Sequence, residues 1–493
     1  MASFFDDPLL IRTLPCLLIA VLLCLPGFLH GTLIGSAGAE VYGHAWLHQL
    51  AISSWPLLPR VEDWALCGDR PVIDPISTWI FAGLGHWIGG VLSWNLRILL
   101  GLWLVGIGGG RFVEAFSGNS RSFLLGSLAM VAAPIFLGSL TSGLTEDVFW
   151  GMVLLGWADL LEGRLLRGTL WLGGSAFCGL YLGWMGGMGA LLLGLWSLNQ
   201  NRAAWKSWAG AGILLLALGG LAAWPHAGRL SQSDPTHPFL PQPEPFWMLN
   251  PWHGVDLASF LAPGKPLLNG ALLREHPSYL GVLLLGLAFY GGWHPLWILW
   301  MLLLAVSLGP FLCWKGIPLG MENPLLPLFQ TLPFASHWHH YGRVLLAGQT
   351  LLTGLASRGF LKISYKIPTI KHWLPLMVVF ELLFLSPARF PLPETAVSSP
   401  DIYEHLDLLP EGSVLVLGAA GPGIHPQKVF FDQSAHHRKL LHDPDLPRPL
   451  KKIPSQTVVV VLGTSEDPLI QETERRLGPA QVQTTDGEAW FIP

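Results

Sequence analysis

The sequence predicts an all-α polytopic membrane protein with about 11 transmembrane helices, followed by a small extracytoplasmic α/β domain. Of the 493 residues, 51% are hydrophobic and only 12% are charged, which is about half the charged share of a soluble domain. Runs of about 20 apolar residues, enough to cross a bilayer core of about 30 Å, recur through the first four-fifths of the chain. They have helical length, unlike the alternating strands of about ten residues in a membrane barrel.

Eleven segments of residues 1–390 are predicted to span the membrane, because each is apolar over a helical length. They cover residues 10–30, 94–110, 121–140, 147–162, 168–182, 184–199, 207–224, 278–292, 295–312, 341–357 and 372–387. The segment 75–92 is short, rich in glycine and contains His86. It is predicted to be an interfacial or re-entrant helix, with a twelfth span as the alternative.

Lysine and arginine set the predicted orientation, because short cytoplasmic loops are enriched in them. With a cytoplasmic N-terminus, all the short basic connections lie inside: Arg111, Arg121, Arg164, Arg167, Arg202, Lys206, Arg358, Lys362, Lys366 and Lys371. The long loops 31–74, 225–277 and 313–340 then share the outer side with the tail. The sequence thus predicts an odd number of spans in a bacterial inner membrane, with the C-terminal domain outside.

Charge and cysteine content argue against several other classes. The net charge of −4 is spread along the chain, and no basic stripe with interleaved aromatic residues suggests a nucleic-acid partner. The five cysteines include no CxxC pair, so a cysteine-based zinc site is not expected. Asp6 and Asp7 precede the first apolar run and no small-residue cleavage site follows it, so we expect no cleaved signal peptide. The lipid bilayer is therefore the predicted environment of the apolar helices.

The composition changes over residues 397–493. Here "SVLVLG" and "TVVVVLG" are compact β-branched runs typical of strands. Polar turns separate them, and "SEDPLIQETERRLG" is predicted to form a helix before the final "AWFIP". These features predict the small α/β domain.

The stretch "GSAGAEVYGHAWLHQLA", directly after the first span, places Glu40, His44 and His48 four residues apart. On a helix these side chains form one stripe. Simple interpretations exist for each, since Glu40 could cap the helix that it begins. His44 and His48 could lie at the membrane interface with their polar tips in water. The stripe is therefore either an ordinary wet face or part of a reactive site.

Polar residues from four loops gather on the predicted outer side, and ionisable groups at membrane depth are costly unless they have a function. The candidates beyond the stripe are Asp74, Glu146, Asp147, His276, Tyr279, His337, His340 and Arg343. Helix capping is the alternative for the three carboxylates, and snorkelling to lipid headgroups is the alternative for the arginine. Their convergence on one face favours a common site.

The order of these motifs resembles the type C (GT-C) membrane glycosyltransferases, and in particular uncharacterised bacterial relatives that use polyprenyl-phosphate-linked sugars. The resemblance rests on "AEVYGHAWLHQLA", "DPIS", "SGLTED", "VDLASFLAP", "HPSYLG" and "HHYGR", and covers most of residues 10–390. It implies that Glu40, where the family usually has aspartate, deprotonates or orients the acceptor. It also implies that Glu146, Asp147 or Asp74 binds a divalent metal ion or the acceptor, and that Arg343 holds the lipid phosphate.

Elementary chemistry agrees with these roles. Glycosyl transfer from a phosphate leaving group builds positive charge on the sugar and negative charge on the phosphate. Glu40 with His44 would supply the base and its orienting partner. Arg343, with His337 or His340, would receive the phosphate, because its planar fork matches phosphate oxygens. His276 and Tyr279 complete the predicted substrate-binding set, and a metal ion bridging Glu40, His44 and Asp74 is a further option.

Two other functions fit parts of the sequence. A transporter is suggested by the glycine-rich segment "GLYLGWMGGMGALLLG", which is typical of discontinuous spans. The charges within the predicted spans are few, however, chiefly Arg97, Asp159 and Glu381. The other candidate is a non-catalytic GT-C-shaped scaffold of an envelope or motility assembly, with envelope proteins as partners. Glutamate in place of aspartate at position 40, and the lack of a compact acidic dyad in the first loop, favour this scaffold.

Overall fold

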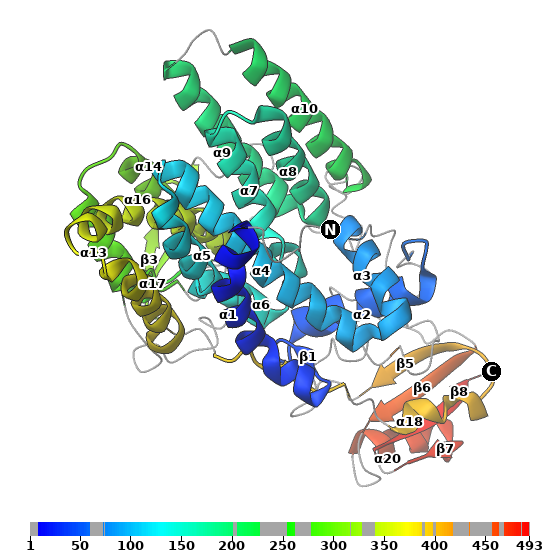
Figure 1. The fold of residues 1–493 in the computed structure, drawn as a ribbon. Coiled ribbons are helices and arrows are strands. Elements are labelled where there is room, and N and C mark those ends of the chain that lie inside the picture. Colours follow the sequence, from blue (N-terminus) through cyan, green and yellow to red (C-terminus); the bar gives the residue numbers. More distant parts are fainter. Residues whose placement is uncertain are drawn as a thin grey trace. The chain divides into compact units, whose positions relative to one another are not determined.

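The computed structural model describes residues 8–59, 72, 74–200, 205–226, 254–261, 278–315, 317–327, 341–386, 390–397, 401–417, 433, 456–462, 468–484 and 486–492. These residues are mostly helical (Figure 1). Contacts divide the chain into two compact units. The first comprises Met1–Leu29, Asn95–Ser233 and Pro241–Pro393, and the second comprises His30–Trp94, Asp234–Leu240 and Glu394–Pro493.

The first unit is a bundle of helices. Its helices are α1 (Pro8–His30), α4 (Gly90–Ser117), α5 (Phe123–Val131), α6 (Pro134–Ser142), α7 (Trp150–Leu161), α8 (Leu165–Cys178), α9 (Leu180–Gln200), α10 (Trp205–Ala223), α13 (Val282–Gly291), α14 (Leu296–Ser307), α16 (Leu345–Lys366) and α17 (Ile370–Phe380). In the described residues, five segments are long and apolar enough to cross a membrane: Ile11–His30, Gly90–Ser117, Ser120–Ser142, Trp205–Ala223 and Tyr341–Lys366. These five helices are candidate membrane spans by length and composition, and the count of eleven stays a prediction.

Proline residues explain two differences from the predicted spans. The span predicted over 121–140 is interrupted between α5 and α6, because Pro134 has no N–H to donate and disfavours helix at Ala133. The span predicted over 295–312 ends early, at Ser307, and Gly309 with a φ of 71° is followed by Pro310 and a strand. The breaks leave helices shorter than the apolar runs from which they were predicted.

Ion pairs join helix ends in the first unit. The Arg12 Nη2 atom lies 3.2 Å from Glu114 Oε1, and the Arg111 Nη2 atom lies 2.8 Å from Glu162 Oε1. A third ion pair joins Arg167 to the buried Asp159, with 2.8 Å between Nε and Oδ2. Arg111 and Arg167 belong to the basic connections predicted to be cytoplasmic, so acidic partners fix these connections to the bundle.

The second unit combines helices with a mixed sheet. Its elements are β1 (Leu33–Ile34), α2 (Ala39–Ser54), α3 (Pro75–Ile88), β4 (Glu394–Thr395), α18 (Asp401–Glu404), β5 (Ser413–Leu417), β6 (Thr457–Leu462), α20 (Pro468–Leu477), β7 (Val482–Gln483) and β8 (Gly487–Ile492). The strand order is β5-β6-β8-β7, with β5 parallel to β6 and the other neighbours antiparallel. The β-branched runs of the sequence thus form the two parallel strands, where a strand buried on both faces reads as a continuous apolar run.

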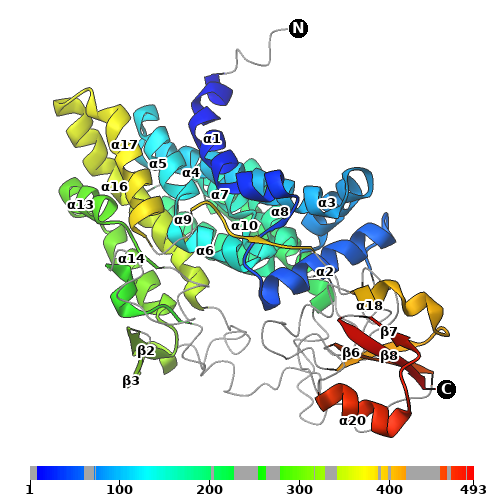
Figure 2. The ribbon, with the colours of Figure 1, turned by 90° about the horizontal axis from the view of Figure 1, so that it is seen from below.

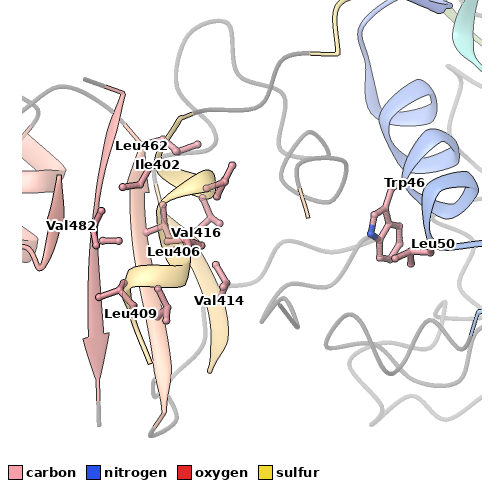
Figure 3. Packing of buried hydrophobic residues seen from close by; sticks show 13 residues of the cluster. Trp46, Leu50, Ile402, Leu406, Leu409, Val414, Val416, Leu462 and Val482 are labelled. Carbon is pink, nitrogen blue, oxygen red and sulfur yellow. The ribbon is translucent and has the colours of Figure 1, made fainter. Parts of the chain in front are cut away.

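Both faces of this sheet carry buried side chains. One cluster gathers Ile402, Leu406, Leu409 and the inward residues of β5, β6 and β7, and it also includes Trp46 and Leu50 of α2 (Figure 3). The opposite face packs Val459, Val461 and Trp490 with Ile470 of α20. The Trp46 indole donates a hydrogen bond of 2.6 Å to Gln433. The first predicted outer loop and the tail therefore share one compact unit.

A short strand pair joins the first and last chain segments of the second unit. Leu33 pairs with Thr395 and Ile34 with Glu394. The Glu394 carboxylate accepts a hydrogen bond of 2.7 Å from the Thr32 hydroxyl and lies 2.8 Å from His30 Nδ1. These contacts lower the pKa of Glu394 below its usual value, and the Thr32 hydrogen bond is the larger cause.

Glu394→Gln is expected to loosen this strand pair in a pH-dependent way. A carboxylate with a lowered folded-state pKa stabilises the fold above its unfolded-state pKa, and loses this effect as pH falls through the folded-state pKa. The amides of Leu33 and Ile34 should exchange roughly two- to fivefold faster in the variant at neutral pH, since exposed pairs contribute little. The difference should vanish in acid. A difference that persists in acid below the folded-state pKa of Glu394, by hydrogen-exchange mass spectrometry, would contradict the assignment.

Candidate functional site

A turn between α6 and α7 holds two buried carboxylates. Helix α6 ends at Gly143, whose φ of 82° is a left-handed conformation that glycine adopts at low cost. The turn Thr145–Asp147 follows directly, and Glu146 and Asp147 are both buried in it. The sequence motif "SGLTED" thus forms a helix end with its acidic side chains inside the first unit, not in solvent.

Arg343 meets these carboxylates from a distant part of the chain. It lies in the 3₁₀ turn Tyr341–Val344 that leads into α16, and is only 2% exposed. Its Nη1 donates a hydrogen bond of 2.7 Å to Glu146 Oε1, and its Nε lies 3.6 Å from Asp147 Oδ2. Two of the four sequence motifs that were predicted to converge therefore lie together in one unit.

An aromatic ring covers the guanidinium. The Cζ atom of Arg343 lies 4.5 Å from the ring centroid of Tyr181, near the start of α9. Cations over an aromatic face are stabilised by the ring quadrupole, more strongly where water is excluded. Tyr181 therefore fixes the plane of the guanidinium while the carboxylates fix its direction. We name Arg343, Glu146, Asp147 and Tyr181 the buried charge cluster.

Gly179 makes room for the acidic turn. It separates α8 from α9, and a Cβ atom there would lie 2.8 Å from the Glu146 carbonyl oxygen and 2.9 Å from Glu146 Cβ. Both distances are shorter than ordinary van der Waals contact, and one involves backbone. The glycine-rich segment that suggested a transporter thus serves the packing of this turn.

Hydrogen bonds attach α16 to its neighbours just beyond the cluster. The Trp150 indole donates to the Thr350 hydroxyl over 3.3 Å, and the Gln349 amide donates to the Leu280 carbonyl over 3.2 Å. All these polar groups are buried, and such satisfied contacts hold neighbouring side chains in fixed positions. Arg343 lies in the turn directly before α16, so these bonds hold in place the helix that follows it.

Arg343 has N–H donors that the two carboxylates of the cluster do not use. Two carboxylates face one guanidinium, and burying such groups is unfavourable unless each is paired. Arg343 has five N–H donors, and its hydrogen bond to the described residues uses only Nη1. The Nη2 donors make no hydrogen bond within the described part of the chain. A planar, oriented guanidinium with donors to spare suits an anion such as phosphate.

Tyr279 has a different neighbour. It is buried, and its hydroxyl donates a hydrogen bond of 2.5 Å to Glu381 Oε1. Glu381 also accepts the backbone N–H groups of Val282 and Leu283, which begin α13. Those N–H groups lack partners within their own helix, so Glu381 completes the start of α13. The structure thus gives Tyr279 and Glu381 a role in holding this helix.

The first-loop candidates lie in the second unit. Glu40 is in the first turn of α2, and its side chain is outside what the structure describes. His44 and His48 are buried, and His48 Nε2 lies 2.7 Å from Ser93 Oγ. The predicted stripe thus forms on one helix, and its histidines are not a wet face.

Asp74 directly precedes α3, with Pro75 as the first helical residue. It is buried, and its Oδ1 accepts a hydrogen bond of 2.6 Å from the Thr78 hydroxyl. Asp74 thus holds the N-cap position of α3, as the helix-opening alternative expects, but its carboxylate bonds the Thr78 hydroxyl and makes no capping bond to a helix N–H. Its role in binding substrate stays a prediction.

The remaining candidates, His276, His337 and His340, lie outside the described residues. Over the ranges that are described, no three His, Cys, Asp or Glu side chains are grouped closely enough to hold a metal ion. Sequence reasoning did not find Tyr181, Gly179 or the Tyr279–Glu381 pair as parts of these arrangements. A tyrosine and a glycine at a helix start carry no local signal of a partner that is distant in the sequence.

No protein-family model matches the sequence, and no curated protein matches it. Two solved structures of the oligosaccharyltransferase of Archaeoglobus fulgidus are similar. The apo form has a TM-score of 0.49 at 13% identity, and the match covers 90% of this chain and 66% of that one. AglB in complex with an inhibitory peptide and a dolichol-phosphate has a TM-score of 0.42 at 10% identity, covering 90% and 65%. The chain thus spans less than two thirds of their length, and similarity of this size assigns neither family nor activity.

Proposed function

We propose that this chain is a GT-C-like integral membrane glycosyltransferase. It transfers a sugar from a polyprenyl-phosphate-linked donor to an extracytoplasmic acceptor of a bacterial envelope. The observation that supports this proposal is the buried ion pair of Arg343 with Glu146 and Asp147. An apolar helical bundle gains nothing obvious from three buried charges, whereas a phosphate-handling site needs an oriented cation.

The reaction breaks the bond between the anomeric carbon and the phosphate oxygen and forms a bond from that carbon to the acceptor. The polyprenyl phosphate leaves with the electron pair, so negative charge grows on its oxygen. A cation placed at that oxygen stabilises the transition state more than the ground state. The Nη2 side of Arg343 would supply this interaction, while Glu146 and Asp147 keep the guanidinium oriented.

The acceptor loses a proton, which requires a base. Glu40 is proposed as this base with His44 as its orienting partner, because both lie on α2 four residues apart. His276, Tyr279, His337, His340 and Asp74 are proposed to contact substrate. A divalent metal ion is proposed to be bridged by Glu40, His44 and Asp74, and Glu146 or Asp147 is the alternative acidic ligand for a metal ion or the acceptor.

The proposed topology has eleven spans, a cytoplasmic N-terminus and an extracytoplasmic C-terminal α/β domain over residues 397–493. The basic connections with Arg111 and Arg167 support this orientation. A lipid-linked donor presents its headgroup at the membrane surface, so an outer site at the ends of α6, α9 and α16 would meet it.

A non-catalytic scaffold is the second candidate. It is favoured by one observation, namely that Arg343 already has two carboxylate neighbours, as in an ion pair that only joins helices. In that case the buried charge cluster would contribute to fold specificity alone.

Two variants in a sugar-transfer assay separate these functions. Glu40→Gln should abolish transfer at unchanged membrane expression, because an amide cannot accept the acceptor proton. Arg343→Ala should weaken the apparent affinity for the lipid-linked donor more than that for the acceptor. Retained turnover in the first variant would remove Glu40 from the mechanism. An unchanged donor dependence in the second would favour the scaffold.

A further inference from the structure

A β-hairpin projects from the end of α14. Strands β2 (Phe311–Trp314) and β3 (Ile317–Glu322) pair antiparallel (Figure 2). Trp314 lies opposite Ile317. Paired residues of two strands point to the same face, and residues two apart along a strand share it. Trp314, Ile317 and Leu319 therefore share one face. The register shifts between Phe311 and Cys313, where Gly320 has a φ of 66°, but Glu322 pairs with Phe311. Met321, next to Glu322, thus returns to the side of Trp314, and the four side chains form one apolar face of the hairpin.

This apolar face is uncovered. Trp314 is 48% exposed, Ile317 67%, Leu319 45% and Met321 57%. The other face is different, since Cys313 is buried there. Strand β2 packs against the 3₁₀ turn Leu257–Phe260, which supports the hairpin from the body of the first unit. The face that points away from the body of the first unit thus carries the large apolar side chains of the hairpin.

The base of the hairpin is fixed to the helix that precedes it. The Asn323 side-chain amide donates hydrogen bonds of 2.7 Å to the carbonyls of Ala305 and Gly309. The Asn323 backbone N–H donates to the Pro310 carbonyl over 2.8 Å. These bonds satisfy the Ala305 carbonyl in the last turn of α14, which has no partner within the helix, and two carbonyls of the segment that follows it. The hairpin therefore cannot move far from the end of α14.

Helix α14 indicates what covers the apolar face. It is one of the shorter apolar helices of the first unit, and its outward residues Ile298, Met301 and Leu302 are all exposed. In a membrane bundle, such residues face lipid tails. Only three residues separate the end of α14 from β2. The apolar surface of the helix thus continues within a few residues into that of the hairpin.

We propose that the β2–β3 hairpin is a membrane-interface anchor, with Trp314, Ile317, Leu319 and Met321 inserted among the lipids at the end of the bundle that holds Arg343. Tryptophan is enriched at this depth of the bilayer, where its amphipathic ring meets the headgroups. The exposed Lys315 at the turn has a long stem that allows its charge to stay at the surface. The anchor does not depend on the proposed enzymatic activity.

Two neighbouring positions of β3 provide the test. Met321→Cys and Glu322→Cys point to opposite faces, and both residues are exposed. Each would be made in the full chain with its five native cysteines replaced, labelled with a polarity-sensitive fluorophore and placed in phosphatidylcholine nanodiscs. Lipids with a nitroxide near the glycerol end of the acyl chain should quench the label at position 321 roughly threefold more than the label at 322. Aqueous iodide should show the reverse order.

Other outcomes would overturn the proposal. Strong iodide quenching at position 321 would place the apolar face in water, and protection from both quenchers would place it under protein. Leu319→Cys, on the same face, must behave like Met321→Cys. Unchanged gel-filtration elution and circular dichroism would show that the labelled variants are folded.

Discussion

Glu146→Leu is expected to destabilise the protein by about 3 kcal/mol, because Arg343 stays buried without its nearest counter-charge. Arg343 is 2% exposed and its Nη1 donates to Glu146 over 2.7 Å. Asp147, with an Oδ2 atom 3.6 Å from Nε, would compensate only in part. The free energy of unfolding, followed by circular dichroism in a denaturing-detergent titration, measures the loss.

The triple variant Glu146→Leu, Asp147→Asn and Arg343→Met is the control, because Asp147 is buried as well and would be left without a cation if only Glu146 and Arg343 were replaced. Removing all three charges leaves neutral groups of similar size, which often restores much of the stability lost by breaking a buried pair. We expect the triple variant to be clearly more stable than Glu146→Leu alone. Equal instability of the two variants would show that the ion pair does not determine the loss.

Gly179→Ala is expected to cost about 1–3 kcal/mol, because the added methyl group would press on the Glu146 carbonyl and Cβ. Its backbone φ of 171° is extended and suits any residue, so the effect would be purely steric. Gly187→Ala is a matched control in the following helix α9, where a Cβ meets nothing within 4 Å. This control should be neutral or slightly stabilising, since alanine favours helix over glycine.

The same titration distinguishes the outcomes for these glycines. If Gly179→Ala is as stable as Gly187→Ala, the acidic turn is not packed against the start of α9 in the way described. In the expected case Gly179→Ala should also weaken donor use, because it displaces the turn that orients Arg343. Gly187→Ala should leave donor use unchanged.

Periodicity predicted those parts of the fold that depend on local pattern. The four-residue spacing of Glu40, His44 and His48 predicts α2, and the β-branched runs at 413–417 and 457–462 are strands β5 and β6. Apolar length predicts membrane-spanning helices, and five helices of the described residues are long and apolar enough to cross a membrane. These features need no knowledge of distant contacts.

Features that depend on tertiary contacts were not predictable in this way. The pairing of Arg343 with Glu146 joins residues 197 positions apart, and only the shared outer side suggested it. Tyr279 gave no sequence sign that it would contact Glu381. The β2–β3 hairpin falls where a span and a loop were predicted, because apolar composition alone does not distinguish a short strand from the end of a helix.

The most direct test of the proposed function is lipid binding to the full chain in nanodiscs. Polyprenyl phosphate and neutral polyprenol share their tail, so a difference between them reports the phosphate site alone. We predict that the wild-type chain binds the phosphate form more tightly, and that the triple variant Glu146→Leu, Asp147→Asn and Arg343→Met loses this preference while it stays folded. Equal binding of both lipids to the wild-type chain, or an unchanged preference in the triple variant, would contradict the phosphate role of Arg343.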